Sequence, residues 1–137
     1  MVMSMRKPIE TELGIISGRD AIYLDEQRIA TKPYGLIFKG DFNGNLCSNN
    51  TTGKEWIPYE LSFDYPLYFV CYELDLYPYE LPLPSSFNTV AESELIASLF
   101  KQDWTGNLAK TDLNHYVLAT YDYVYEILAQ DFKLSIL

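Results

Sequence analysis

The sequence predicts an α+β fold, in which an antiparallel sheet of about six strands carries one or two helices packed on one face. Two observations lead to this prediction. Short apolar runs separated by turn residues fill the first two-thirds of the chain, and a helical pattern follows at residues 89–100. The 137 residues contain no internal repeat and no Gly/Ser-rich linker, which indicates a single domain spanning residues 1–137.

The first strands are expected to form an antiparallel meander. Strand segments expected at 21–24 and 28–31 flank the polar sequence Asp25-Glu26-Gln27, which is typical of a turn. A further strand is expected at 35–39. The pair Asn43-Gly44 then predicts a type I′ hairpin turn, because both central positions of such a turn need positive φ.

The clearest strand pattern lies between Trp56 and Asp64. Apolar and polar residues alternate there with a period of two, which places one set on the core and the other in water. The next segment, Leu67 to Leu76, begins apolar on both faces, and this predicts a strand in the centre of its sheet. Three prolines between residues 78 and 84 exclude a regular strand or helix in that part of the chain.

A helix is expected to begin at Thr89. Thr89 and Glu92 have the spacing of a capping box, and the apolar residues between Val90 and Phe100 form a stripe at helical spacing.

The last part of the chain allows two interpretations. Strands are expected at 116–121 and 132–136. Between them, residues 122–130 fit a short helix capped by Asp122. A strand continued through Tyr125 is the competing interpretation, and periodicity alone does not decide between the two.

The charge distribution limits the kinds of partner that the protein is expected to bind. The formal net charge is −9, and no Lys, Arg or His occurs from Glu55 to Phe100. Such a chain repels phosphate backbones and anionic lipids, so neither nucleic acid nor a membrane surface is an expected partner. Cys47 and Cys71 are too few for a disulfide framework. No apolar run approaches the roughly 18 residues of a membrane span, and a cytoplasmic location is expected.

The same acidic stretch is rich in aromatic residues, which suggests a protein-binding surface. Negative charge steers basic partners, and Trp or Tyr side chains supply most of the affinity in many interfaces. The sequence therefore predicts a non-enzymatic binding or inhibitory protein that docks a basic partner protein. The residues expected to contact the partner are Trp56, Glu60, Asp64, Glu73, Asp75 and Tyr77.

Two alternatives remain open at this point. Glu73 and Asp75 would project from one strand face about 7 Å apart, and with His115 they could serve a small hydrolase or a metal-assisted enzyme. Exposed tyrosines could instead make the protein a self-associating structural or regulatory subunit. The sequence does not fix the oligomeric state.

No cofactor or metal is predicted. The glycines lack the spacing of a phosphate loop or a dinucleotide fingerprint. The sequence Asp41-Phe42-Asn43-Gly44-Asn45 is similar to the start of a calcium loop, but Leu46 and Thr52 stand where that loop needs Gly and Glu.

Two segments carry a resemblance to a known class of protein. Residues 56–63, with the sequence WIPYELSF, and residues 115–127, with the sequence HYVLATYDYVYEI, resemble segments of small acidic bacterial proteins. Some proteins of that kind are immunity proteins, which bind and neutralise a cognate toxin. The resemblance implies a non-enzymatic role, and it assigns no catalytic residue.

Overall fold

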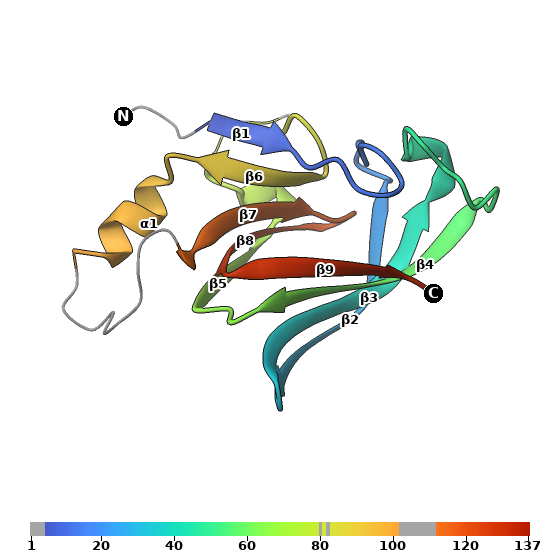
Figure 1. The fold of residues 1–137 in the computed structure, drawn as a ribbon. Coiled ribbons are helices and arrows are strands. Elements are labelled where there is room, and N and C mark those ends of the chain that lie inside the picture. Colours follow the sequence, from blue (N-terminus) through green and yellow to red (C-terminus); the bar gives the residue numbers. More distant parts are fainter. Residues whose placement is uncertain (1–4, 80, 82, 102–111) are drawn as a thin grey trace.

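Two antiparallel sheets make up the computed structural model, which describes residues 5–79, 81, 83–101 and 112–137 (Figure 1). The first sheet has the strand order β1(Met5–Pro8), β6(Phe87–Ala91), β7(Asn114–Ala119), β8(Tyr123–Ala129) and β5(Tyr68–Glu73). The second has the order β2(Ile22–Thr31), β3(Tyr34–Asn43), β4(Trp56–Asp64) and β9(Asp131–Ile136). The described helices are the short 3-10 helices η1(Gly44–Leu46) and η2(Leu74–Leu76) and the α-helix α1(Glu94–Leu99).

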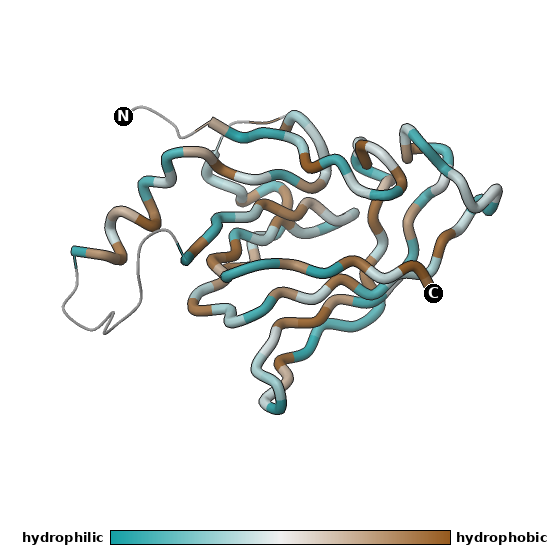
Figure 2. Tube along the Cα trace, in the orientation of Figure 1, coloured by the Kyte–Doolittle hydropathy of each residue, from teal (hydrophilic) through white to brown (hydrophobic). Residues whose placement is uncertain are grey.

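Aromatic rings from both sheets meet in the main hydrophobic core. The Phe38 ring of β3 lies 4.9 Å from the Tyr125 ring of β8, and Phe63 of β4 lies 5.2 Å from Tyr116 of β7. Burial of a large apolar side chain stabilises a fold by about 1.5–3 kcal/mol, so these contacts hold the two sheets face to face. Apolar and polar residues alternate along the strands of the second sheet (Figure 2), as expected for a sheet with one solvated face.

The predicted strand from Trp56 to Asp64 is confirmed as β4, with the same bounds. Its apolar set is buried and its polar set lies outside. The buried side chains are Ile57, Tyr59, Leu61 and Phe63.

The predicted α+β class is wrong, because the fold is mainly β and α1 has six residues. The expected helix from Thr89 is replaced by β6, in which Thr89 pairs with Lys7 of β1 and Tyr116 of β7. Pairing on both sides outweighs a local capping signal, since helix propensity is a weak preference beside tertiary contacts. The helix begins only after Ser93, whose hydroxyl accepts the amide hydrogen of Ile96.

Tyr123–Ala129 form the strand β8, so the predicted short helix is wrong. The alternative of one strand continued through Tyr125 is also wrong, because the chain turns at 120–122 between β7 and β8, where the amide of Thr120 donates to the carbonyl of Tyr123. Val124 to Ala129 are all buried because β8 lies between β7 and β5 and is covered on both faces. A strand of that kind loses its period of two. By contrast, the predicted central strand at 67–76 is the edge strand β5, which ends at Glu73 and pairs only with β8.

Two predicted turns are also wrong. Asp25-Glu26-Gln27 continues β2 through a bulge between Leu24 and Glu26. A bulge absorbs one extra residue without ending the strand, so polar composition alone does not distinguish it from a turn. Asn43-Gly44 leads into η1, and Gly44 does not have the positive φ of a type I′ turn. Its missing side chain leaves room instead for the carbonyl of Lys54, which would lie 2.2 Å from an added Cβ.

Within the described ranges, no helix is long and apolar enough to cross a membrane.

We expect glycine to be required at position 40 of β3, where the backbone of the paired strand β2 comes very close. An added Cβ at Gly40 would lie 1.9 Å from the carbonyl oxygen of Tyr23, whereas at Gly35 of the same strand the nearest atom is 3.4 Å away. We expect Gly40→Ala to lower the free energy of unfolding by about 1–3 kcal/mol or more, as overpacking does. Gly35→Ala is the control and should change it by less than about 1 kcal/mol. Urea unfolding of both variants checks this, and equal stabilities would contradict it.

Candidate functional site

The predicted contact residues of β4 are spread along one strand. Trp56, Glu60 and Asp64 share the outer face of the second sheet, and Trp56 has 46% of its surface exposed. The strand rise places Glu60 about 13 Å and Asp64 about 27 Å from Trp56. One small site cannot include all three.

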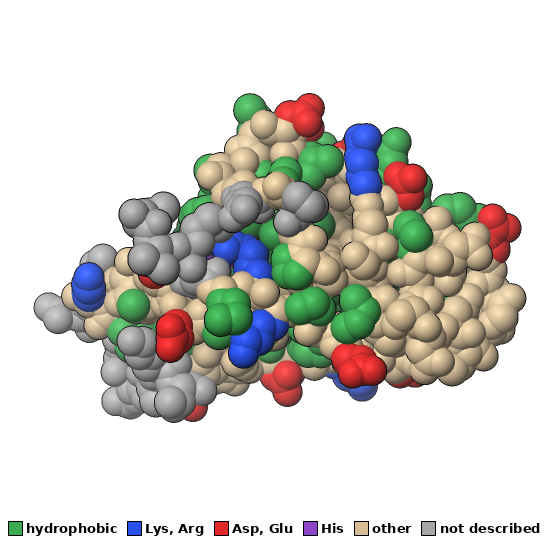
Figure 3. Space-filling model, turned by 90° about the horizontal axis from the view of Figure 1, so that it is seen from above, with side chains coloured by type: hydrophobic (Ala, Val, Ile, Leu, Met, Phe, Trp, Pro, Cys, Tyr) green, Lys and Arg blue, Asp and Glu red, His purple; other side chains and the backbone are tan. Residues whose placement is uncertain are grey.

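Strand pairing also brings positive charge beside these acids. Lys39 of β3 lies opposite Glu60, and its Nζ is 3.4 Å from the Glu60 carboxylate. Lys133 of β9 lies opposite Ser62. A stretch of sequence without basic residues is therefore not a surface without them. The face seen from above likewise shows acidic and basic side chains interspersed (Figure 3).

Glu73 ends β5 of the first sheet and Asp75 lies beyond it in η2, so the prediction that both project from one strand face is wrong. Both are exposed, and the Glu73 carboxylate accepts the amide hydrogen of Asp75 at 3.1 Å. The amide of Leu74 between them donates to the carbonyl of Asp122 at 2.9 Å. This hydrogen bond holds the segment that carries the two acids against the turn between β7 and β8.

The same turn carries Tyr121, which belongs to a partly exposed aromatic cluster. The Tyr23 ring lies 5.3 Å edge-on from Trp56 and is stacked at 5.3 Å on Tyr121. The guanidinium of Arg19 lies 4.7 Å above the Tyr121 ring. The amide of Tyr121 donates to the carbonyl of Ile22 at 3.0 Å, which fixes the turn against β2.

We define the aromatic–acidic patch as Tyr23, Trp56, Tyr121, Asp20 and Asp122. Burial and then the negative charges of Asp20 and Asp122 raise the pKa of Tyr23, while Arg19 acts in the opposite direction. Of these residues, sequence reasoning found only Trp56. Tyr23 and Tyr121 join it because β2 and the β7–β8 turn meet at this end of the molecule, which local patterns do not reveal.

A mainly apolar cavity of about 490 Å³ adjoins the patch at Arg19. Its walls come from η2 and the segment after it, from the end of β7 and from the loop before β2. They include Arg19, Leu74, Leu81, Leu83, Ala119 and Thr120.

Tyr77 does not lie on the surface with the other predicted contact residues. It is 7% exposed, and its hydroxyl donates to Glu126 Oε2 at 2.5 Å. His115 is also buried, with Nε2 2.6 Å from Glu126 Oε1. The guanidinium of Arg6 lies 3.7 Å from Oε2. A buried carboxylate in β8 is thus surrounded by donors from other elements, as a buried charge requires.

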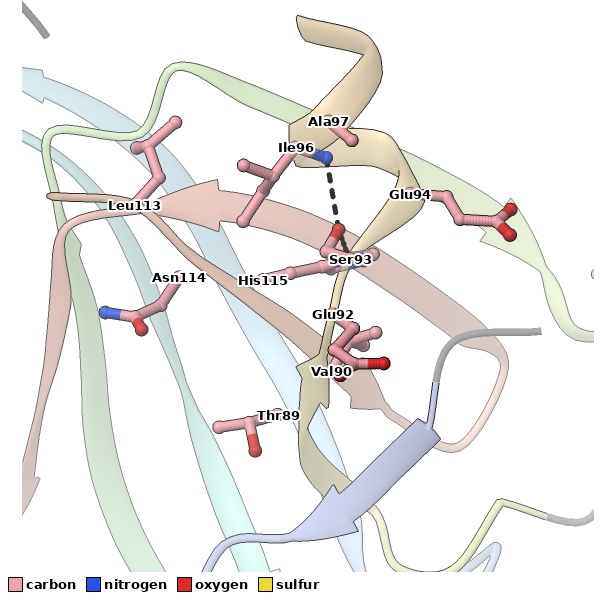
Figure 4. Close-up of a pocket in the computed structure, with 10 residues that line it drawn as sticks. All are labelled: Thr89, Val90, Glu92, Ser93, Glu94, Ile96, Ala97, Leu113, Asn114 and His115. Carbon is pink, nitrogen blue, oxygen red and sulfur yellow. Dashed lines mark hydrogen bonds between the residues drawn. The ribbon is translucent and has the colours of Figure 1, made fainter. Parts of the chain in front are cut away.

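The second nitrogen of His115 faces a serine. Nδ1 lies 2.7 Å from Ser93 Oγ, and this oxygen also accepts the amide hydrogen of Ile96 at 3.1 Å (Figure 4). The carboxylate of Glu126 can only accept, so Nε2 carries a hydrogen. In the neutral ring Nδ1 is then the acceptor, and the Ser93 hydroxyl donates to it.

The structure does not bring His115 together with Glu73 and Asp75. In the register of the first sheet, His115 lies opposite Leu128 and Glu73 lies opposite Tyr123, at the other end of β8. The partners of His115 are Ser93 and Glu126, which sequence reasoning missed. The signal for Glu126 was a single charged residue inside an otherwise apolar strand. Among the described residues, no group of three or more His, Cys, Asp or Glu side chains could hold a metal ion.

Comparison with protein-family models, with curated proteins and with solved structures finds no match for this chain. The geometry of the patch and of the Ser93–His115–Glu126 chain therefore carries the functional argument.

Removing the Tyr77 hydroxyl is expected to destabilise the fold. Tyr77→Phe takes one donor from the buried Glu126 carboxylate, and hydrogen bonds to charged groups contribute about 1.5–3 kcal/mol. We expect the free energy of unfolding in urea to fall by that amount. Tyr68→Phe is the control on exposed β5 and should change it little. An unchanged stability of Tyr77→Phe would contradict the assignment.

Buried tyrosines are expected to make the fold sensitive to alkaline pH. Burial, and then the charge of Asp131, raises the pKa of Tyr116 to about 12. Unfolded tyrosines titrate near pH 10, so the folded state keeps this proton where the unfolded state loses it. The resulting stabilisation is complete below about pH 10 and is lost as the pH rises toward about 12. Urea unfolding between these limits should show a steeper loss for the wild type than for Tyr116→Phe, and parallel curves would contradict this.

Proposed function

We propose that the protein is a binding protein that docks a basic partner protein through the aromatic–acidic patch. The observation that carries the proposal is the cluster in which the exposed rings of Trp56 and Tyr121 both contact the partly buried Tyr23, assembled from distant parts of the chain beside aspartates. Exposed aromatic clusters of this kind are typical of interfaces, where Trp and Tyr are enriched.

Charge favours a basic partner over other proteins. Asp20 and Asp122 lie within the patch, and Glu73 and Asp75 continue it across the Leu74–Asp122 hydrogen bond. The chain as a whole has a formal net charge of −9. A complementary positive surface would be steered toward the patch, and salt would weaken this attraction. Glu60 and Asp64 lie outside this region, and Tyr77 is buried.

The adjoining cavity favours a partner with an apolar anchor between its basic residues. Leu74, Leu81 and Leu83 line the cavity, and Arg19 stands between it and the Tyr121 ring. Anchors that fill such pockets at the centre of an interface are the usual energetic hot spots. A Lys- or Arg-flanked Leu or Phe of the partner fits this combination.

An inhibitory, immunity-like role fits this proposal best, with a toxin-like basic protein as the partner. Small acidic inhibitors use charge to reach their targets quickly and aromatic contacts to hold them. A cytoplasmic location belongs to the proposal.

The patch is tested by affinity capture followed by titration of the purified partner. We expect a basic protein whose affinity falls with salt, and Trp56→Ala and Tyr121→Ala should each weaken binding by about 2 kcal/mol or more, as hot-spot truncations do. Tyr65→Ala is the matched control. It removes a tyrosine that is 55% exposed and lies beyond the opposite end of β4.

Three results would contradict the proposal. The captured partner could be acidic, its affinity could be indifferent to salt, or the patch variants could bind as well as Tyr65→Ala. Light scattering on the purified protein tests one further alternative. If the protein self-associates through the patch, the molecule that binds the patch is a second copy of this chain and not a basic partner.

A further inference from the structure

We propose that Ser93 is a nucleophile, with His115 as its general base, in a site that hydrolyses neutral or cationic carboxylic esters. The site is an open cavity of about 420 Å³ lined by both residues (Figure 4). It lies beside α1, at the opposite end of β7 from the aromatic–acidic patch, and is independent of the proposed binding function.

The three polar groups come from separate elements and form one hydrogen-bonded chain. Ser93 precedes α1, His115 lies near the start of β7, and Glu126 lies in β8. The two distances along the chain are 2.7 Å from Ser93 Oγ to His115 Nδ1 and 2.6 Å from Nε2 to Glu126 Oε1. A hydroxyl within hydrogen-bond reach of an imidazole that a carboxylate orients is the grouping of an activated serine, and here the two ring nitrogens exchange the roles that they have in the Ser-His-Asp template.

The backbone holds the serine at a sharp junction between strand and helix. Glu92, directly after β6, has a φ of 52°, a left-handed conformation that is uncommon outside glycine and often occurs at functional sites. The bond from the amide of Ile96 then fixes Ser93 Oγ. The rotamer that faces His115 is therefore imposed before any substrate binds, and such positioning lowers the entropic part of a barrier.

The proton path follows from these bonds. His115 Nδ1 takes the hydroxyl proton as Ser93 Oγ forms a bond to the ester carbonyl carbon, and the protonated ring gives that proton to the departing alkoxide as the ester bond breaks. Water then attacks the acyl-serine, loses a proton to Nδ1, and releases the carboxylic acid while Oγ recovers its hydrogen. Glu126 is the positioning residue, because it accepts the hydrogen of Nε2 and thus selects the tautomer of the neutral ring in which Nδ1 faces Ser93 as the acceptor.

The cavity wall selects the substrate class. Val90, Ile96, Ala97 and Leu113 provide apolar surface that suits a short acyl chain. Glu92 and Glu94 also line the cavity, and their charge disfavours an anionic substrate.

The test uses the full chain and an alkyl fluorophosphonate, which forms a stable phosphonyl ester with activated serines and releases fluoride. We expect one adduct on the native protein, mapped to Ser93 by peptide mass spectrometry, and none on heat-denatured protein. We also expect hydrolysis of p-nitrophenyl butyrate and not of its anionic analogue p-nitrophenyl succinate.

Variants separate chemistry from structure. Ser93→Gly removes the hydroxyl but keeps a residue accepted at a helix N-cap, and it should abolish labelling and turnover while the protein stays folded. Ser98→Ala on α1 is the control and should keep both. His115→Gln should slow turnover by about 10²–10⁴-fold, the usual contribution of a general base.

The proposal would be overturned by native protein that takes up no fluorophosphonate, by an adduct on any other residue, or by equal turnover in folded Ser93→Gly. If Ser93→Gly does not fold, the position of the adduct on the wild-type chain still decides.

Discussion

The buried carboxylate of Glu126 is the constraint on which much of the structure depends. It sits in β8, a strand covered on both faces, where an unpaired charge would cost several kcal/mol. Its oxygens are satisfied by Tyr77, His115 and Arg6, which belong to the segment after η2, to β7 and to β1. The carboxylate therefore joins β8 to β1 at one edge of the first sheet and to the segment after η2 beside the other edge. A polar centre of this kind specifies one arrangement, because slipping any partner strand would leave the charge exposed to apolar neighbours.

This constraint explains why the first sheet has two buried faces in a small protein. The face toward the second sheet carries Tyr116, Tyr125 and Ile127 in the main core. The opposite face carries Val117 and Val124 under Tyr77 and Leu83, and Leu128 packs with Ile96 of α1. The segment after η2 and α1 thus act as a partial third layer around Glu126. Both cavities lie where this layer ends, one beside α1 and one beside η2.

The elements that were predictable from the sequence are those whose pattern is local. β4 has a solvated outer face, so its alternation of period two predicts its bounds. The periodicity of β8 fits both a strand and a helix, because both faces of the strand are buried. Glu126 on its outer face is covered by its partners, so exposed polar residues do not alternate with buried apolar ones. Thr89 has the local spacing of a helix cap, but pairing with Lys7 and Tyr116 places it in a strand. The candidate sites follow the same rule: Trp56 was visible as an aromatic in an acidic stretch, whereas its contact with Tyr23 and that of Ser93 with His115 exist only after the strands are ordered.

The two sites are joined by β7, and this strand favours their energetic independence. His115 and Tyr121 are about 20 Å apart by the strand rise. Coupling over that distance needs an element with two discrete arrangements. β7 offers none, because its backbone is bonded to β6 and β8 and its interior from His115 to Leu118 is buried. Occupation of the aromatic–acidic patch should therefore leave the distance between Ser93 Oγ and His115 Nδ1 unchanged. An effect of a partner on that pair would have to act through the segment after η2. Tyr77 in this segment packs with Leu74 and Leu83, and it donates a hydrogen bond to Glu126, the carboxylate that orients His115.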